Sequence, residues 1–412
     1  MTDGKNSRFK FAAVTLLNLG TFSWFFIFVF CFDDISAVLT PNTPGWGAIV
    51  GNSLFYGFTI FWAIAVSFIG GKINRRKLLF TSIILGIFST ILMAFLEGPF
   101  FASILISLMG TSLGLGMPSS MALVADYTVV DNRGRASGII VLGTFIVAFA
   151  SIGIYGMLGL GIFGLILILV AVRLISVFGL VSGKLGRALT VAEKKIRLPT
   201  AAYREFLFYL SPWVMFTIAS SLARNLVTAG SLESGVDIVE GAYLGDRLRY
   251  VFIAVFGLAA GFMADRLGRK QPIILGIATF GIGYLLLGFS MGEMAVNIYY
   301  VLSGITWGLF FVVFLAVPGD LSTPILRERF YALGYILPVT ALFAISTIPV
   351  ENIGEHVGAA LIAQIVGGCI FLSMYPVFRA KETLTEKKMR ERKMKEYAER
   401  LGKTIQETEE NQ

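Results

Sequence analysis

Apolar residues along this chain occur in blocks of about twenty, and the short segments between the blocks carry most of the charges. A block of this length forms a helix that crosses a bilayer core of about 30 Å. Most blocks are apolar on every side, which is typical of helices that face lipid or other helices. We predict an all-α membrane protein with twelve transmembrane helices, at residues 11–36, 46–69, 78–96, 100–123, 136–158, 160–181, 207–231, 248–264, 272–291, 295–317, 330–349 and 355–378.

Charged residues between the blocks predict the orientation. If the N-terminus lies in the cytoplasm, the inner segments before the C-terminal tail hold 20 Lys and Arg residues, whereas the outer segments hold only Arg247 and Arg249. Basic loops stay on the cytoplasmic side of a membrane. We therefore expect a multi-pass protein of the cell membrane with both termini in the cytoplasm, because an odd number of spans would scramble this asymmetry.

Composition excludes several classes of protein. The chain is 56% hydrophobic and 15% charged, whereas a soluble chain carries about 25% charged residues. The net charge of +8 comes from the basic inner segments, so we expect the lipid bilayer and not nucleic acid as a partner. Cys31 and Cys369 lie within apolar blocks and His356 is the one histidine, so we expect no metal, no cofactor and no enzyme active site.

The longest internal polar stretch, from Ser182 to Glu205, is basic and divides the spans into two groups of six. We predict a cytoplasmic N-terminus at 1–10, a six-helix bundle at 11–181, a linker at 182–206, a second six-helix bundle at 207–378 and a charged cytoplasmic tail at 379–412. The tail pairs Glu with basic residues four positions later, as in Glu386 and Arg390, which favours a solvated helix. Binding to a partner or to anionic lipid is the alternative.

The two groups of helices repeat each other. Five pairs of residues differ by 194 positions: Gly110 and Gly304, Gly114 and Gly308, Asp126 and Asp320, Arg133 and Arg327, and Arg135 and Arg329. Upstream, Asn74 and Arg75 pair with Asp265 and Arg266 at an offset of 191, so a short deletion separates the two registers. Charges at a fixed spacing are hard to obtain by chance, and a duplicated six-helix unit is the plan of a transporter with a site between its halves.

The segment that begins at Gly261 contains the pattern G-x-x-x-D-R-x-G-R-K with every fixed position matched. In the first half, Asn74 stands where this pattern has Asp, and the x-Gly pair is missing. Asp126 precedes the sequence Arg-Gly-Arg-Ala at 133–136. These features resemble the loop motifs of the major facilitator superfamily, and the resemblance covers residues 11–378. It implies two pseudo-symmetric six-helix bundles, in which Gly261 would let two helices approach closely.

The resemblance also implies a cytoplasmic cluster of charges that latches the bundles together in the outward-facing state. The residues that match its motifs are Gly70, Asn74, Arg75, Arg76, Asp126, Arg133, Arg135, Gly261, Asp265, Arg266, Gly268, Arg269, Asp320, Arg327 and Arg329. Asp265 would face a helix N-terminus, where the macrodipole favours an anion. Arg266 and Arg269 would pair with Asp320. Because Asn74 offers no full negative charge, we expect the first-half latch to be weaker. The alternative is that these charges only set the topology.

Ionisable residues inside a span are costly and point to function. Asp33 and Asp34 lie in span one, and Arg224 lies in span seven next to Asn225. The offset of 191 carries Asp33 onto Arg224, so an acid and a base would face each other across the pseudo-two-fold axis. A solute or proton that competes for this pair would couple their movements. The alternative is that both Asp residues merely end span one. Arg173, in span six, is expected to snorkel to the interface or to pair between helices.

The resemblance further implies that spans one and seven line a central cavity. The candidates for contact with a solute, besides the ionisable residues, are Asn18, Trp24, Tyr300, Ser303 and Trp307. Each of them is by itself more often a packing residue than a ligand contact, so the prediction concerns the group.

Together these features predict a secondary active transporter that moves a small-molecule solute by alternating access, is driven by protons and acts as a monomer. No G-x-x-x-x-G-K-[ST] loop is present, which argues against transport driven by ATP. A uniporter and a drug-efflux antiporter stay open, although the Gly-Pro pair typical of antiporters is missing from Gly143 to Gly156. A membrane sensor with a transporter-like fold is the alternative from another class, and it would show no solute flux.

Overall fold

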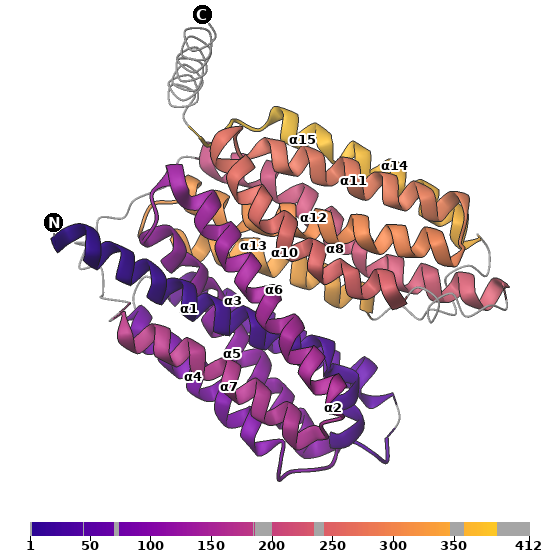
Figure 1. Cartoon of the computed structure of the whole chain (residues 1–412), viewed down its shortest axis with the longest axis horizontal. Coiled ribbons are helices and arrows are strands. Elements are labelled where there is room, and N and C mark those ends of the chain that lie inside the picture. Colours follow the sequence, from indigo (N-terminus) through magenta and orange to yellow (C-terminus); the bar gives the residue numbers. More distant parts are fainter. Residues whose placement is uncertain are drawn as a thin grey trace, which may run out of the picture.

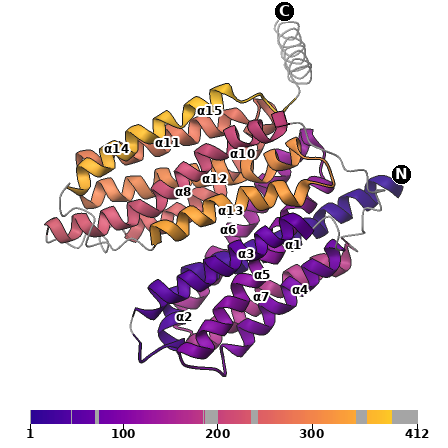
Figure 2. The same cartoon turned by 180° about the vertical axis from the view of Figure 1, so that it is seen from behind.

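The computed structural model describes residues 2–43, 45–69, 74–183, 185, 200–234, 243–346 and 358–384. These residues form helices and connecting turns, with no β-strand among them. Figures 1 and 2 show two bundles of helices that lie side by side. The first contains α1 (Thr2–Phe30), α2 (Phe32–Leu39), α3 (Asn52–Ile69), α4 (Arg75–Leu92), α5 (Pro99–Asp126), α6 (Arg133–Met157) and α7 (Ile162–Ser182). The second contains α8 (Thr200–Ser234), α10 (Tyr243–Arg266), α11 (Lys270–Phe289), α12 (Glu293–Leu321), α13 (Arg327–Ser346), α14 (Ala359–Leu372) and α15 (Met374–Arg379).

Ten helices in the described part of the chain are long and apolar enough to cross a membrane. The predicted all-α membrane fold is confirmed, whereas the count of twelve spans is not. The two helices that fall short are α4 and α13, which pack within the bundles. Helix α4 begins with Arg-Arg-Lys at 75–77, and α13 begins with Arg-Glu-Arg at 327–329. A charged first turn lowers the mean hydropathy of a short helix, so composition alone does not mark these two as spans.

The first predicted span, 11–36, is interrupted in the structure. Helix α1 ends at Phe30, Cys31 forms a turn, and the short helix α2 begins at Phe32. Asp33 and Asp34 lie in the first turn of α2, where the helix macrodipole favours negative charge. The two acids therefore stabilise the start of a new helix instead of lying inside a continuous span, which corrects their predicted place.

Two pairs of helices make the most extensive contacts between the bundles, along what we call the seam. Helix α6 packs against α10, and α3 packs against α13. The offset of 194 carries α6, which starts at Arg133, onto α13, which starts at Arg327, and it carries α3 onto α10. The internal repeat therefore relates the contact between α6 and α10 to the contact between α13 and α3. This is the pseudo-two-fold relation that the repeated sequence predicted.

Glycines bring α6 and α10 into close contact. A Cβ atom added at Gly134 would lie 2.7 Å from the carbonyl oxygen of Gly261, and one added at Gly261 would lie 2.6 Å from the carbonyl oxygen of Gly134. One turn further on, a Cβ at Gly138 would lie 3.0 Å from the carbonyl oxygen of Gly257. Small residues at a crossing let two helix backbones touch. The expected role of Gly261 is thus the one that the structure shows.

The expected linker and tail are described only at their ends. Helix α7 ends at Ser182 and α8 begins at Thr200, and most of the predicted linker lies outside the described residues. Of the predicted tail, residues 380–384 are described, and Ala380 and Leu384 are buried. The charge pattern predicted a solvated tail. The start of the tail is instead docked on the protein.

We predict that Gly261→Ala lowers the thermal stability of the protein, because its methyl group would overlap the backbone of α6. Overpacking of this kind costs about 1–3 kcal/mol. Gly153→Ala is the matched control, because it also lies in a helix, but a Cβ there would meet nothing within 4 Å. The melting temperature of both variants in detergent would be compared with that of the unaltered protein, and equal values for the two would contradict the close crossing.

Candidate functional site

At one end of the molecule, carboxylates and arginines from both bundles gather in what we call the basic-end cluster. Its members are Arg75, Asp126, Arg133, Asp265, Arg269, Asp320, Arg327 and Glu328. Asp320 lies at its centre and forms ion pairs with Arg133 of the first bundle and, at 2.9 Å, with Arg269 of its own bundle. These three side chains are at most 2% exposed. Asp320 therefore bridges the two bundles across the seam.

Asp126 occupies the mirrored position in this cluster. It forms ion pairs with Arg75 of its own bundle and with Arg327 of the other. Asp126 and Arg75 lie 194 positions before their counterparts Asp320 and Arg269, and Arg327 lies 194 positions after its counterpart Arg133. The internal repeat therefore builds two equivalent ion-pair groups, and each group contains one arginine that reaches across the seam.

Asp265 joins α10 to the first turn of α6. Its carboxylate accepts hydrogen bonds from the backbone nitrogens of Gly134 and Arg135, both at 2.9 Å, and from Arg269 Nη1 at 2.7 Å. An anion at a helix N-terminus is stabilised by the unpaired N–H groups and by the macrodipole. The sequence predicted this contact with a helix N-terminus, and the structure shows that the helix belongs to the other bundle.

The offset of 191 assigned Arg75 the wrong counterpart. In the structure Arg75 takes the role of Arg269, at an offset of 194, whereas the side chain of Arg266 is exposed and forms no ion pair with any described residue. Asn74 is not a weakened copy of an acid that crosses the seam. Its side chain accepts a hydrogen bond from the backbone nitrogen of Arg76 at 3.0 Å and so caps α4.

Glu328 supplies a negative charge to the first-half group, and sequence reasoning missed it. This residue begins α13 in the second bundle, and its carboxylate pairs with Arg75 Nε. The expectation of a weaker first-half latch is thereby corrected, because Glu328 crosses the seam in the opposite direction to Asp265. The offset of 194 places Glu328 opposite Gly134, the residue that binds Asp265. At one contact the acid belongs to α10, as Asp265. At the equivalent contact the acid belongs to α13, as Glu328, the position that corresponds to Gly134 of α6.

Two arginines at the rim of the cluster stack on rings of the other bundle. The guanidinium of Arg135 lies 5.4 Å from the ring of Phe262, and that of Arg329 lies 5.9 Å from the ring of Phe68. These pairs also differ by 194 positions, so the cation–π contacts follow the repeat. Of the remaining predicted latch residues, Arg76 is exposed and Gly70 lies outside the described residues.

The end of the described chain caps the same cluster. Glu382 accepts a hydrogen bond from the backbone nitrogen of Arg269 at 2.8 Å, and Thr383 Oγ1 donates to Asp320 at 3.2 Å. Gly268 has a φ of +107°, and a Cβ there would lie 2.5 Å from Glu382. Burial alone would lower the pKa of Arg269, but its partners Asp320 and Asp265 outweigh burial and raise that pKa above its usual value. The guanidinium therefore stays charged.

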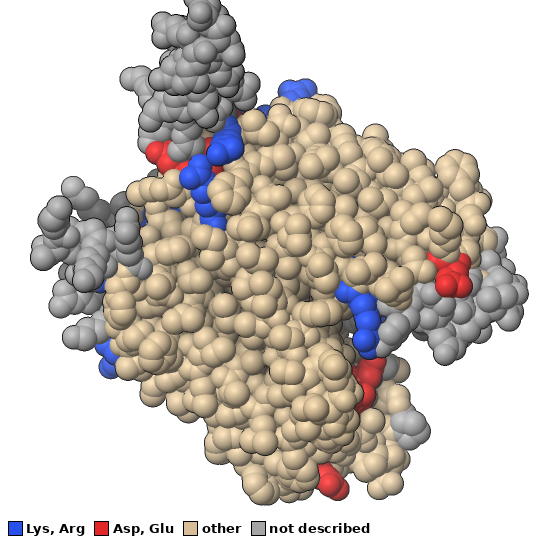
Figure 3. Space-filling model, in the orientation of Figure 1, with Lys and Arg blue, Asp and Glu red and all other residues tan. Residues whose placement is uncertain are grey.

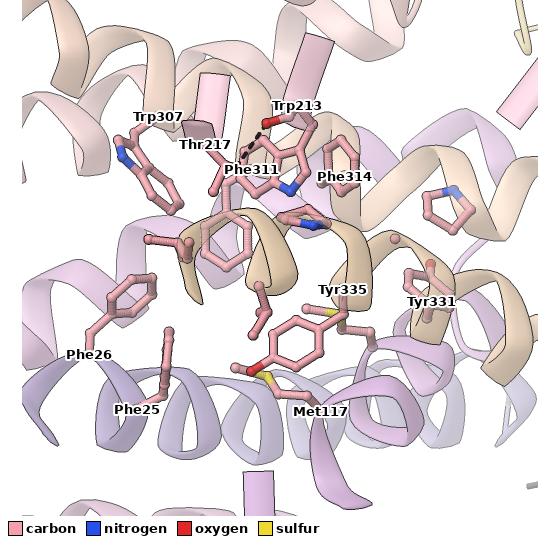
Figure 4. Close-up of a pocket in the computed structure, with 16 residues that line it drawn as sticks. Phe25, Phe26, Met117, Trp213, Thr217, Trp307, Phe311, Phe314, Tyr331 and Tyr335 are labelled. Carbon is pink, nitrogen blue, oxygen red and sulfur yellow. Dashed lines mark hydrogen bonds between the residues drawn. The ribbon is translucent and has the colours of Figure 1, made fainter. Parts of the chain in front are cut away.

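A cavity of ≈ 80 Å³ lies on the seam beside this cluster. Figure 4 shows the 16 residues that line it, which come from α1, α5, α8, α12 and α13. Most are rings or methionines, among them Phe26, Trp213, Trp307 and Phe311. The cavity is therefore mainly apolar and aromatic, and its walls come from both bundles.

Two hydroxyls show how few polar groups the cavity offers. Thr217 Oγ1 donates to the carbonyl oxygen of Trp213 at 2.8 Å and is already engaged. The hydroxyl of Tyr335 is buried and has no hydrogen-bond partner among the described residues. In Figure 4 the Tyr335 side chain extends toward the side of the cavity where Phe25 and Met117 lie. No sequence signal pointed to Tyr335, because its helix was not among those expected to line the cavity.

Of the predicted solute contacts, Trp307 lines the cavity and the others lie elsewhere. Asn18 is buried and its Nδ2 donates to the carbonyl oxygen of Ser120 at 3.2 Å, so it joins α1 to α5. Ser303 is fully buried within the second bundle. Tyr300 lies beneath the guanidinium of Arg249. A role in binding for these three residues stays a prediction that their positions do not support.

Trp24 lies beside Arg173 inside the first bundle. The guanidinium of Arg173 lies 4.7 Å from the Trp24 ring, and its Nη2 donates to Ser112 Oγ at 3.1 Å and to Ser82 Oγ at 3.3 Å. Arg173 is fully buried. Of the two arrangements predicted for Arg173, pairing between helices is therefore observed and snorkelling to the interface is not.

At the opposite end of the seam, Asp33 and Arg224 do face each other. Asp33 Oδ2 lies 3.9 Å from Arg224 Nη2, and both side chains are 81% exposed. Asp34 accepts a hydrogen bond from the hydroxyl of Tyr155 at 3.4 Å, and Asn225 is half-buried. Figure 3 shows acidic and basic side chains at this end, where the surface is hollowed between the bundles. The predicted pairing is present, but water surrounds it, so it holds the bundles together only weakly.

Arg249 is a further charged residue at this end that the sequence pattern placed in a loop. It lies within α10, 2.9 Å from Asp246, and its Nη2 donates to the Tyr250 hydroxyl at 2.7 Å. The ring of Tyr250 contacts that of Phe30 in the first bundle, with centroids 4.6 Å apart. The spacing of Asp246 and Arg249, three residues apart, was the signal that they share a helix face.

Comparison with known proteins identifies the fold of this chain. No protein-family model and no curated protein matches the sequence. Among solved structures, the proton:xylose symporter XylE of the major facilitator superfamily, bound to 6-bromo-6-deoxy-D-glucose, is 14% identical with a TM-score of 0.69, over 92% of this chain and 97% of that one. A bacterial homologue of the iron transporter ferroportin, in an outward-facing state, is 15% identical with a TM-score of 0.64, over 88% and 98%.

The human organic anion transporter MFSD10 is similar to the same degree. It is 13% identical with a TM-score of 0.65, over 90% of this chain and 99% of that one. At such identities the likeness concerns the fold. The chain is therefore a multi-pass membrane protein with the major facilitator fold, which confirms the fold that its loop motifs implied.

We predict that Asp320→Asn opens the basic end of the molecule. The substitution leaves Arg133 and Arg269 buried without a full counter-charge, and breaking a buried pair in this way costs about 3–5 kcal/mol. In the open state both arginines reach water, so the ratio of closed to open molecules should fall by roughly 100- to 4,000-fold. Distances between spin labels at Lys77 and Leu267, two exposed positions on opposite sides of the seam, would measure the change.

The matched control for this experiment is Glu293→Gln, which also replaces an acid by an amide but at an exposed site outside the cluster. It should leave the label distances unchanged. Cys369 is exposed and would be replaced by Ser before labelling, whereas Cys31 is buried. An unchanged distance distribution in Asp320→Asn would show that the cluster does not hold this end closed.

Proposed function

We propose that this chain is a transporter that moves a small solute across the cell membrane by alternating access along the seam. The observation that carries the proposal is the basic-end cluster, because ion pairs such as Arg133 with Asp320 join the two bundles. These pairs form only while the bundles lean together at that end. The cavity lies on the same seam and is lined in part by Tyr331, a residue of the α13 segment that begins at the cluster. A solute in the cavity would then leave on that side of the membrane only after the ion pairs of the basic-end cluster separate.

The charge distribution supports an orientation for this cycle. Basic loops remain in the cytoplasm, so the basic end would face inward and the end with Asp33 and Arg224 would face outward. In that orientation the structure is closed toward the cytoplasm. The solved structures of similar fold are described as a proton:xylose symporter, a bacterial homologue of an iron transporter and an organic anion transporter. They support transport in general without favouring one of these solutes for this chain.

Proton coupling in this proposal takes place at the outward end of the seam. Asp33 and Asp34 are carboxylates of the first bundle at this end, and Asp33 faces Arg224. When this end closes, the pair would lose water, and a proton on Asp33 would remove the attraction. The second candidate is a uniporter, and a specific observation favours it, since no carboxylate lines the cavity among the residues that the structure describes.

Proteoliposomes with a trapped pH-sensitive dye would test the proposal against a panel of sugars, amino acids, organic acids and small aromatic alcohols. We expect at least one solute to enter. Entry that is accompanied by a dye response supports proton coupling, and entry without a response supports the uniporter. If no solute in the panel crosses the membrane while purified protein still binds one of them, a sensor replaces the transporter.

We predict that Arg224→Ala slows turnover by roughly tenfold, the effect of losing about 1.4 kcal/mol in the state that is closed at this end. The reason is that Asp33 would then meet no cation across the seam. Initial rates of solute entry, divided by the amount of inserted protein, would measure it. The exchange of both charges, Asp33→Arg with Arg224→Asp, is the control and should recover most of the rate. Unchanged rates in Arg224→Ala would remove this pair from the cycle.

A further inference from the structure

The cavity on the seam offers a bound molecule aromatic rings, aliphatic side chains and very few polar groups. Trp213, Phe311 and Phe314 form part of one wall, and Phe25 and Phe26 form part of the other (Figure 4). None of the described residues that line it carries a charge. A binding site takes its selectivity from the few polar groups that it places among apolar walls. The scarcity of such groups here is therefore informative about the solute.

A charged solute does not match these walls. An anion would meet the negative faces of aromatic rings and no basic side chain. A cation would be attracted to the faces of Trp213 and Trp307, but this attraction is smaller than the cost of taking an ion out of water without a counter-charge. The carboxylates of the basic-end cluster do not help, because Asp320 and Asp126 are held by arginines. An uncharged solute is the one that the cavity accepts without a penalty of this kind.

A solute with many hydroxyls does not match either. Each buried hydroxyl without a partner is costly. Thr217 already donates to the carbonyl oxygen of Trp213, and the hydroxyl of Tyr331 donates to that of Leu315 at 2.7 Å. Tyr335 is different, because its hydroxyl is buried, lies on a residue that lines the cavity, and has no partner in the described part of the chain. Such a group is a place for one polar group of a ligand.

We propose that the solute is a small uncharged molecule with an apolar body and a single polar group that hydrogen bonds to Tyr335. This inference rests on the proposed function, since it names the substrate class of the same cavity. The volume of ≈ 80 Å³ is smaller than the about 150 Å³ of an apolar cavity that holds benzene. A cavity of this size favours a small solute, and lining side chains would have to rotate to admit a one-ring alcohol.

A series of four compounds with the same ring tests the charge requirement: benzyl alcohol, toluene, benzylammonium and benzoate. Binding to the full chain in nanodiscs would be followed by isothermal titration calorimetry, with empty nanodiscs to correct for partitioning into lipid. Benzyl alcohol should bind at least about tenfold more tightly than either charged compound, because of the cost of burying an ion. D-xylose should not bind. A charged member or D-xylose that binds as tightly as benzyl alcohol overturns the proposal.

Tyr335→Phe tests the hydrogen bond. It should weaken benzyl alcohol about 2- to 12-fold, the range that corresponds to the net contribution of one hydrogen bond, and leave toluene unchanged. Preserved binding of toluene shows that the variant is folded. Equal effects on both compounds, or no effect on either, overturn the role of Tyr335.

These results are separable from those of the proposed function. Binding of benzyl alcohol that depends on Tyr335, with no flux of any compound, supports the inference about the cavity and contradicts transport. Flux of a sugar or of a charged solute supports transport and contradicts the inference.

Discussion

A carboxylate buried away from water needs several donors around it, and at the basic end of this molecule neither bundle supplies them all. Asp320 lies between an arginine of its own bundle and Arg133 of the other, and Asp265 accepts hydrogen bonds from the first turn of α6. If the bundles separated here, water would have to replace these donors. The relative position of the bundles is thereby tied to the solvation of a few charges, with a dry closed arrangement and a wet open one.

The seam divides into parts with different physical roles. Its two ends carry charges, which are paired and buried at the basic end and paired but exposed between Asp33 and Arg224. Its middle carries rings around a cavity. Contacts between rings bury no charge that needs a partner, so in the proposed cycle they would let the bundles rock without fixing them. The ends would then decide which side is closed, and the middle would decide which solute is held.

Particular residues show how far the repeat in the sequence reached. The offset of 194 found the partners Asp126 and Asp320, and it also relates Phe68 to Phe262, a pair that the pattern of charges did not reveal. The offset of 191 failed at Asn74, because it matched an amide with the acid Asp265, whereas the charge that pairs with Arg75 comes from Glu328 in the other bundle. A repeat in one dimension locates equivalent positions, but it does not say from which bundle the partner of a charge arrives.

The sequence by itself determined that this chain is helical, crosses a membrane and is built from a duplicated unit, because length, hydropathy and the spacing of charges are properties of the chain as a line. Only the tertiary structure decided which charges are buried together, that Asp33 stays in water, and that Tyr335 rather than Trp24 reaches the cavity. The physical reason is that these helices are apolar on every side. Such a helix carries no polar stripe to show which face turns toward lipid, toward its own bundle or toward the seam.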